Sequence, residues 1–307
     1  MHELIDISTW EDDRMANYGG YTRKCGKISP DGEKYMVKFE KKHSFKSAPL
    51  NLFNQHINSE ILRLLGFPVQ ETFLGICDDY LVLCCKNFVP EGSKLITFDV
   101  FLRQIYNSYE LTEFTDLDQF EHVMSTNELL KPYKNKLTKS FWDMVVLDVF
   151  LMNLERTTSD FGYLISKDVV TPAPLFDNRT DGQACTVPLR KDGKPILRDD
   201  LLYSNEFKDF HDSVARILPV LECKMDDIYN LIHKQECLSE SQKSWKFEQL
   251  QKTLHDLKCS YAIQQVSSTM AIENLNFTEQ ARKNLKEIAT GQKTVAEIIE
   301  EIKHRYS

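Results

Sequence analysis

The chain has 307 residues, 42% apolar and 27% charged, which is enough to bury a full core and favours two domains or one domain with an appendage. Its formal net charge of -8 argues against general binding of nucleic acids or anionic membranes, because both need a basic excess. The chain contains no long apolar run, no leader-like start and no Cys-x-x-Cys pair among its eight cysteines. We therefore expect reduced thiols and a cytoplasmic protein without a membrane segment.

The first 90 residues predict strands around one helix. Within residues 25–39, two alternating runs flank a Ser-Pro-Asp-Gly turn at 29–32, which is typical of a hairpin. Residues 51–65 then carry apolar side chains at helical spacing. Two further apolar runs predict a second pair of strands, at 72–76 and 80–85.

Helical patterns dominate after residue 90. Apolar spacing predicts helices at 98–106, at 141–154 and within 207–264. Two short strand pieces are expected between them, at 161–165 and 169–170, and the acidic run 116–121 is interpreted as a solvated face. A β-rich part followed by a mostly helical part indicates an α+β, two-lobed fold.

The last 45 residues predict a compact run of small helices. Thr278, with Phe277 before it, is a candidate helix cap with a hydrophobic staple. Thr290-Gly291 ends that helix. A capping box from Thr294 to Glu297 begins a final helix that runs to Tyr306.

The strongest chemical signal is Asn-Leu-Glu-Arg-Thr-Thr-Ser-Asp-Phe-Gly at 153–162, followed by Pro-Ala-Pro-Leu-Phe-Asp at 172–177. These segments place an arginine and three carboxylates in the order in which kinase folds deliver a base and two Mg²⁺ ligands. Upstream, the Gly-Gly pair at 19–20 would let backbone approach a phosphate, and Lys38 at a strand end is a candidate phosphate ligand.

With these segments, the chain resembles the HipA-like kinases, and most of all their compact CtkA-type branch. The matching motifs occur in order and cover most of residues 1–260, at 5–11, 18–26, 32–39, 64–72, 83–88, 141–144 and 153–178. The resemblance implies a bilobal protein-kinase-like fold. Its β-rich N-lobe would span 1–90 and its helical C-lobe, with the catalytic loop, 91–262.

The resemblance also implies binding of ATP and Mg²⁺. Glu155, Lys38 and Arg156 would form the catalytic group, and Asp160 and Asp177 would hold the metal. The segment 83–88 would be the hinge for the adenine. The residues expected around the nucleotide are Gly19, Gly20, Lys24, Lys38, Gln55, Cys85 and Lys86.

Four positions depart from the family pattern. Glu155 replaces the catalytic aspartate, and the extra methylene displaces the carboxylate by about 1 Å, which can cost on the order of 10²-fold in rate. Asp160 replaces a metal-binding asparagine and retains an oxygen ligand. Gln55 stands where a glutamate would pair with Lys38, Glu60 lies on another face of the same helix, and Arg23 replaces a glycine. Two alternatives stay open: an active kinase for a protein Ser/Thr hydroxyl, and a pseudokinase that acts as a nucleotide-binding scaffold.

The tail contains Thr269-Met-Ala-Ile-Glu273-Asn274, which resembles the inhibitory helix of antitoxins that silence Fic-domain AMP-transferases. Residues 263–307 as a whole resemble a VbhA-type antitoxin domain. This implies a toxin–antitoxin setting in which Glu273 pairs with the arginine that a separate Fic chain uses for the ATP γ-phosphate. The alternative is a plain CtkA-type kinase whose tail is a structural extension of the C-lobe.

Overall fold

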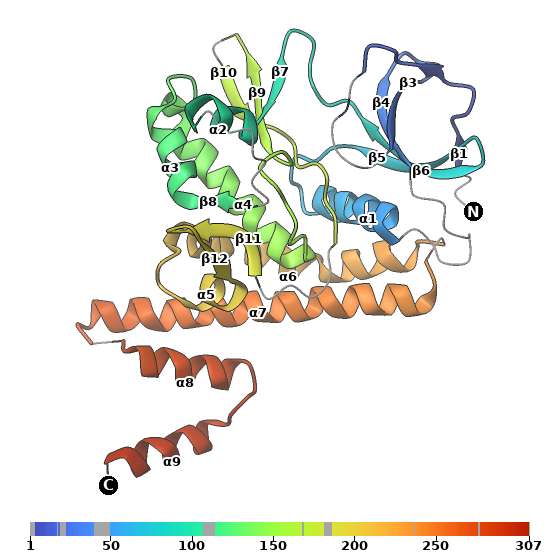
Figure 1. Ribbon diagram of the computed structural model, residues 1–307. Helices are drawn as coiled ribbons and strands as arrows, with labels where there is room; N and C mark the ends of the chain where they lie inside the picture. Colours follow the sequence, from blue (N-terminus) through green and yellow to red (C-terminus); the bar gives the residue numbers. More distant parts are fainter. Residues whose placement is uncertain are drawn as a thin grey trace.

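The computed structural model describes residues 4–16, 18, 23–39, 50–106, 114–167, 169–180, 186–236, 238–275 and 277–306. A β-rich N-terminal lobe lies beside a larger helical lobe, with helix α1 (Leu50–Leu64) beneath the sheet (Figure 1). α1 contacts β5 (Thr72–Cys77) and β6 (Tyr80–Lys86) of the sheet and α6 (Lys208–His233) of the helical lobe. The predicted α+β, two-lobed fold is confirmed.

The sheet of the N-lobe follows the order β1, β5, β6, β4, β3, β2 in the described part of the chain, and only β1 and β5 pair in parallel. The predicted hairpin is confirmed, since Gly32 N donates to Ser29 O over 2.9 Å in the turn between β3 and β4. Gly32 has a φ of 86°, which a residue without Cβ adopts readily. The strands not yet bounded are β1 (Ile5–Asp6), β2 (Glu11–Asp12), β3 (Lys24–Ile28) and β4 (Lys34–Phe39).

The centre of the helical lobe is α4 (Lys134–Leu151), which is buried along nearly all of its second half. It begins and ends earlier than the predicted 141–154, because polar residues extend its start and Met152 turns left-handed at φ 59°. Around α4 lie the other helices, α2 (Phe98–Tyr106), α3 (Leu117–Thr126), the 3₁₀ turn Lys131–Tyr133, α5 (Arg198–Tyr203) and α7 (Glu240–Ile272).

Two small sheets flank the helices. The first follows the order β10 (Val169–Pro172), β9 (Gly162–Ser166), β7 (Lys94–Thr97), so it contains both strand pieces that the sequence predicts. The second was not predicted, and it comprises β12 (Lys194–Leu197), β11 (Thr186–Lys191) and β8 (Thr115–Asp116). β8 has only two residues, and the other two strands each contain a proline.

The acidic run 116–121 is more than the solvated face that we expected. Asp116 caps α3 by accepting hydrogen bonds from Asp118 N and Gln119 N, and Phe120 in the same run is buried in the core. The charged residues of this run therefore begin a helix whose other face packs inward.

The tail continues directly from the helical lobe. α7 is one uninterrupted helix across the expected boundary at residue 263, so any division of the chain here passes through a helix. Beyond it lie α8 (Glu279–Ala289), capped by Thr278 as predicted, and α9 (Val295–Tyr306), which begins at the predicted capping box of Thr294 and Glu297 (Figure 1).

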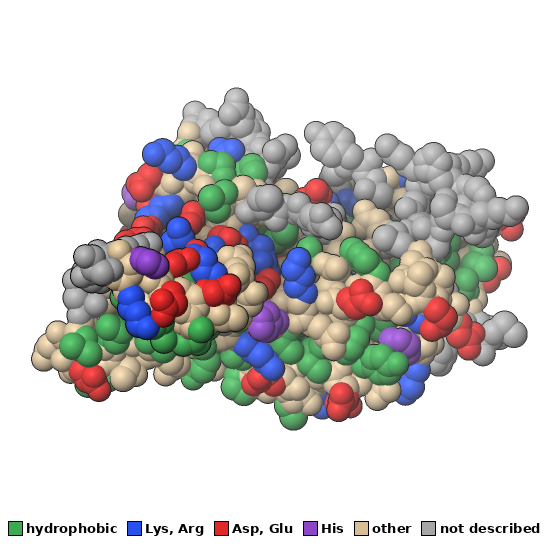
Figure 2. Space-filling model, turned by 90° about the horizontal axis from the view of Figure 1, so that it is seen from below, with side chains coloured by type: hydrophobic (Ala, Val, Ile, Leu, Met, Phe, Trp, Pro, Cys, Tyr) green, Lys and Arg blue, Asp and Glu red, His purple; other side chains and the backbone are tan. Residues whose placement is uncertain are grey.

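None of the described helices is long and apolar enough to cross a membrane. Figure 2, which views the molecule from below, shows acidic and basic side chains interspersed on that face.

Candidate active site

Lys38 and Asp177 meet where the two lobes join. Lys38, buried on β4, donates from Nζ to Asp177 Oδ1 over 2.7 Å and to Gln55 Oε1 of α1 over 2.9 Å. The contact joins a strand of the N-lobe, the helix beneath it and the segment after β10, although 139 positions separate Lys38 from Asp177 in the chain.

Asp177 occupies an unusual backbone conformation between two cations. Its φ is 54°, the left-handed region that residues with a Cβ seldom adopt, so the surrounding structure must hold it there. Arg179 Nη2 lies 2.7 Å from Oδ2, opposite the Lys38 contact. Burial alone would raise the pKa of Asp177, but Lys38 and Arg179 hold the pKa below its ordinary value. The carboxylate is therefore ionised.

Gln55 takes the place of an acidic partner for Lys38. Its Oε1 accepts from Lys38, and its Nε2 donates to Asn51 Oδ1 over 3.2 Å, so Gln55 is hydrogen-bonded to Lys38 but forms no ion pair with it. Glu60 pairs with Arg63 one turn away. Lys24 lies directly across the strand pair from Lys38, and burial, followed by the charge of Lys38, lowers the pKa of Lys24.

Arg156 anchors the loop between α4 and β9. Its guanidinium donates to both oxygens of Asp148, over 2.5 and 2.9 Å, and also to Asp160 O, Phe176 O and Asn178 Oδ1. Both Arg156 and Asp148 are buried, so the bidentate pair ties the loop to the segment that carries Asp177. Sequence reasoning missed Asp148. The available signal was a lone carboxylate within the apolar stretch of α4.

Glu155 and Asp160 occupy opposite environments on this loop. The side chain of Glu155 is exposed, and no hydrogen bond or ion pair holds it among the described residues. Asp160 is buried, and its Oδ2 accepts from both Thr157 N and Thr157 Oγ1 over 2.9 Å. Within the described residues, hydrogen bonds reach only Oδ2 of Asp160, which leaves Oδ1 as a possible ligand atom.

Two strands approach each other so closely at Gly162 that only glycine fits there. A Cβ on Gly162 would lie 2.3 Å from Ile96 O of β7, so no larger residue fits without moving the backbone.

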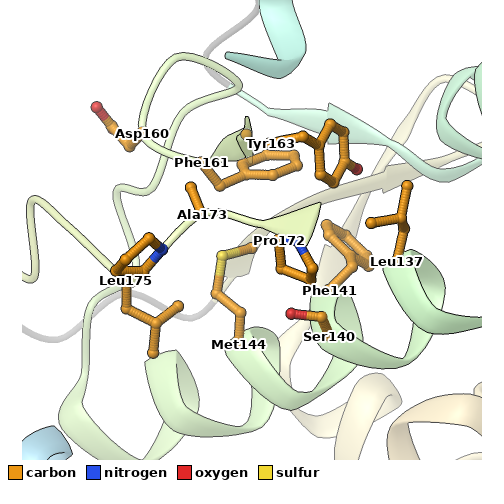
Figure 3. A pocket seen from close by; sticks show the side chains of 12 residues that line it. Leu137, Ser140, Phe141, Met144, Asp160, Phe161, Tyr163, Pro172, Ala173 and Leu175 are labelled. Atoms are coloured by element: carbon orange, nitrogen blue, oxygen red, sulfur yellow. The ribbon is translucent and has the colours of Figure 1, made fainter. Parts of the chain in front are cut away.

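The pocket under this strand is about 20 Å³ and mostly apolar, and Figure 3 shows the Asp160 carboxylate pointing away from it. That volume suits a water molecule and not a nucleotide. A larger hollow of about 400 Å³ involves none of the expected site residues.

No family model matches the chain. The serine/threonine-protein kinase CtkA of Helicobacter pylori is 27% identical over 311 residues, which cover 91% of this chain and 92% of that protein. The crystal structure of CtkA superposes with a TM-score of 0.73 at 24% identity and covers 86% of this chain and 99% of that one.

The chain has the CtkA-type, HipA-like kinase fold. HipA of Shewanella oneidensis, solved with HipB and operator DNA, matches with a TM-score of 0.56 at 13% identity and covers 81% of this chain and 66% of that one. These relatives support the family relationship that the sequence motifs indicate.

Four of the expected nucleotide-binding residues belong to two segments, 19–20 and 85–86. Gly19 and Gly20 fall outside the described residues. Cys85 and Lys86 end β6, where Lys86 N donates to Glu71 O and Lys86 O accepts from Gln70 Nε2. Cys85 is buried, and burial raises the pKa of its thiol to about 11, so this cysteine acts as a packing residue.

The tail motif lies at the far end of α7. Thr269 bonds back to Gln265 O of its own helix, Glu273 is the C-cap, and Asn274 turns left-handed at φ 56°. All three side chains of the motif are exposed. The helix therefore ends where the motif predicts.

Proposed function

We propose that the chain binds ATP with Mg²⁺ between its lobes and transfers a phosphoryl group to a protein Ser or Thr hydroxyl. The observation that carries this proposal is the meeting of Lys38 and Asp177, one from each lobe, in a chain similar to a serine/threonine-protein kinase along nearly its whole length. Phosphoryl transfer depends on positioning and on neutralising charge, and this pair supplies both functions.

Each polar residue of the site takes a defined part. Lys38 and Lys24, neighbours across two strands, attract the phosphates. Asp177 and Oδ1 of Asp160 are hard oxygen donors that would hold Mg²⁺, which neutralises phosphate charge when bound. Exposed Glu155 accepts the proton of the incoming hydroxyl. Arg156 fixes the position of the loop relative to the Asp177 segment through its hydrogen bonds to both.

The pseudokinase alternative rests on the same residues. Gln55 gives Lys38 no ionic partner on α1, and Glu155 places its carboxylate one methylene farther out. In this alternative the Lys38–Asp177 site still binds the magnesium nucleotide, but the chain acts as a scaffold. The two functions make the same prediction for binding and opposite predictions for transfer.

Labelled ATP with Mg²⁺ distinguishes them. We expect autophosphorylation in the wild type and none in Asp177→Ala. Asp192→Ala is the matched control, because Asp192 is also left-handed but lies in the exposed turn between β11 and β12. If the wild type and Asp192→Ala bind the nucleotide without becoming labelled, and Asp177→Ala does not bind it, the pseudokinase is favoured. A wild type that binds no nucleotide would refute both functions.

We further propose that the tail restrains a Fic-type AMP-transferase, as an antitoxin does. Glu273 is exposed at the end of α7, and no described residue pairs with it, so its carboxylate is available to an arginine of a partner. Ile272 and Leu275 beside it are 82% and 52% exposed, which supplies apolar contact area around the charge.

The structural alternative for the tail has support as well. Arg282 of α8 donates to Tyr203 O over 2.7 Å, Lys286 pairs with Asp199, and Cys259 of α7 donates to Ala289 O. These contacts hold α8 against the kinase-like body. They leave the end of α7, with Glu273, exposed.

Co-expression with a Fic enzyme tests the antitoxin role. Glu273→Gln keeps the helix end and removes the charge, so we expect AMP transfer to be released. Glu279→Gln is the control, because Glu279 is exposed at the start of α8. Unchanged inhibition by Glu273→Gln would leave the structural alternative.

A further inference from the structure

Lys246 is a buried lysine without a carboxylate partner among the described residues. It lies on α7 with 2% of its surface exposed, although lysine is almost never fully buried unless it is paired. Its Nζ donates to Asn58 Oδ1 over 2.8 Å and to Thr180 Oγ1 over 2.7 Å. Both partners are uncharged, so Lys246 is held by hydrogen bonds and not by an ion pair.

The lysine determines which way the Asn58 amide faces. A lysine amine only donates in these contacts, so it must face the amide oxygen, and the amide nitrogen is directed to the opposite side. There Nδ2 of Asn58 donates to Asn178 O over 3.0 Å, to Arg179 O over 2.7 Å and to Thr180 Oγ1 over 3.0 Å. One amide thus holds the backbone that directly follows Asp177.

Thr180 connects the same group to the end of α4. Its hydroxyl accepts from Lys246 and from Asn58 and donates to Leu151 O at the end of α4 over 3.4 Å. Asn58 lies on α1, one turn from Gln55, the residue that bonds Lys38. The group therefore joins α1, α4 and α7 around residues 178–180.

We propose that Lys246 is a positioning residue that, through Asn58 and Thr180, holds Asp177 in its left-handed, metal-binding conformation. This inference rests on the proposed role of Asp177 as a Mg²⁺ ligand. Lys246 itself touches neither metal nor nucleotide. The groups that orient metal ligands characteristically affect metal affinity about 10- to 100-fold when removed.

The chemistry of the site favours an amine over an apolar side chain. Burial lowers the pKa of Lys246 to about 7, so part of the population is neutral near neutral pH. A neutral amine still has two N–H groups, which match the two acceptors. Lys246 can therefore keep the Asn58 amide oriented without a permanently buried charge.

The test compares binding of a non-hydrolysable ATP analogue in Mg²⁺ and in EDTA. For Lys246→Met we expect the Mg²⁺-dependent gain in affinity to fall about tenfold, with binding in EDTA nearly unchanged. Lys243→Met is the matched control, since Lys243 is buried one turn earlier on α7 but pairs with Glu240. It should keep the full Mg²⁺ gain.

A second variant covers the possibility that Lys246→Met folds poorly. Asn58→Asp offers Lys246 an ionic partner and keeps the side-chain shape, but removes the donors to residues 178 and 179. We expect it to fold and to lose the same Mg²⁺ gain. An intact gain in either folded variant, or equal losses in Mg²⁺ and EDTA, would overturn the inference. A wild type that binds the analogue without any Mg²⁺ gain would refute the metal role of Asp177, and this inference with it.

Discussion

Single residues decide whether the Lys38 site works as a kinase. Lys38 has the carboxylate of Asp177 on one side and the uncharged amide of Gln55 on the other, so only one of its two contacts is an ion pair. An uncharged amide attracts an ammonium group less strongly than a carboxylate does. Lys38 is therefore held more strongly by Asp177 than by α1.

Gln55→Glu should restore that restraint. A carboxylate at the position of Oε1, 2.9 Å from Lys38 Nζ, would form an ion pair and hold the lysine between both sides. We expect autophosphorylation to rise about tenfold, which corresponds to ~1.4 kcal/mol in the barrier. Gln55→Met, which retains no acceptor, is the control and should be slower than the wild type. A Glu variant no faster than the wild type would show that Gln55 does not limit the reaction.

Lys246 predicts a pH dependence of stability. Its pKa is lowered from 10.5 to about 7 in the folded chain, so between these values the unfolded chain binds more protons. Stability contributed by this group therefore rises with pH above 7 and is lost as pH falls toward 7. In urea unfolding from pH 7 to 9, we expect the unfolding free energy of the wild type to rise relative to that of Lys246→Met by about 1.4 kcal/mol per pH unit at most. A constant difference would contradict the lowered pKa.

Among the elements, α7 carries residues of two different proposed sites, one at each end. Its first turns carry Lys246 under the Asp177 segment, and its last residues carry the exposed Glu273 motif. At 33 residues it is about 50 Å long, so the two ends belong to different neighbourhoods. Figure 1 shows α8 returning along this helix toward the body.

Thr278→Ala should loosen α8 without affecting the kinase-like body. Thr278 Oγ1 accepts from Ala281 N over 3.1 Å, and loss of such a cap costs about 1 kcal/mol. Amide hydrogen exchange should accelerate in 279–289 while α4 stays protected. Thr269→Ala is the control, because the Thr269 hydroxyl bonds within its own helix and caps nothing. Faster exchange throughout the C-lobe would instead make the tail part of the main core.

Over the whole molecule, the Asp177 segment is one of the places where the two lobes contact each other. Through Lys38 it contacts β4, and through residues 178–180 it contacts α1, α4 and α7. A ligand that binds here stabilises both lobes at once, because it binds only the assembled fold.

Magnesium nucleotide should therefore raise the stability of the two lobes together. At a concentration 100 times its Kd, the gain is about 3 kcal/mol. Hydrogen exchange should slow in β4 and in α7 to a similar degree, and Asp177→Ala should abolish both effects. Protection confined to the N-lobe would place the nucleotide away from Asp177.

Much of this architecture was predictable from local patterns. Hairpin, helix and cap signals act between residues a few positions apart, so the β3–β4 turn, α1 and the Thr278 and Thr294 caps agree with their predictions. Strands β8, β11 and β12 were missed, since β8 has only two residues and the other two contain Pro188 and Pro195, and proline argues against a strand. The continuity of α7 was missed as well, because the resemblance of the tail to a separate domain suggested a boundary that no helix-breaking residue marks.

The residue types of the candidate site were determined by the sequence alone: Lys38, Glu155, Asp160 and Asp177 stand in the order of a kinase. Only the tertiary structure decided which groups support them. Asp148 left only a weak signal, a carboxylate within an apolar stretch, which does not say that Arg156 is its partner. The bond of Lys246 to Asn58 across 188 positions left none, because a hydrogen bond between distant residues depends on how the helices pack. Residue spacing reflects only local backbone geometry. Which polar side chains pair depends on which are buried together, because a polar group removed from water must form its hydrogen bonds within the protein.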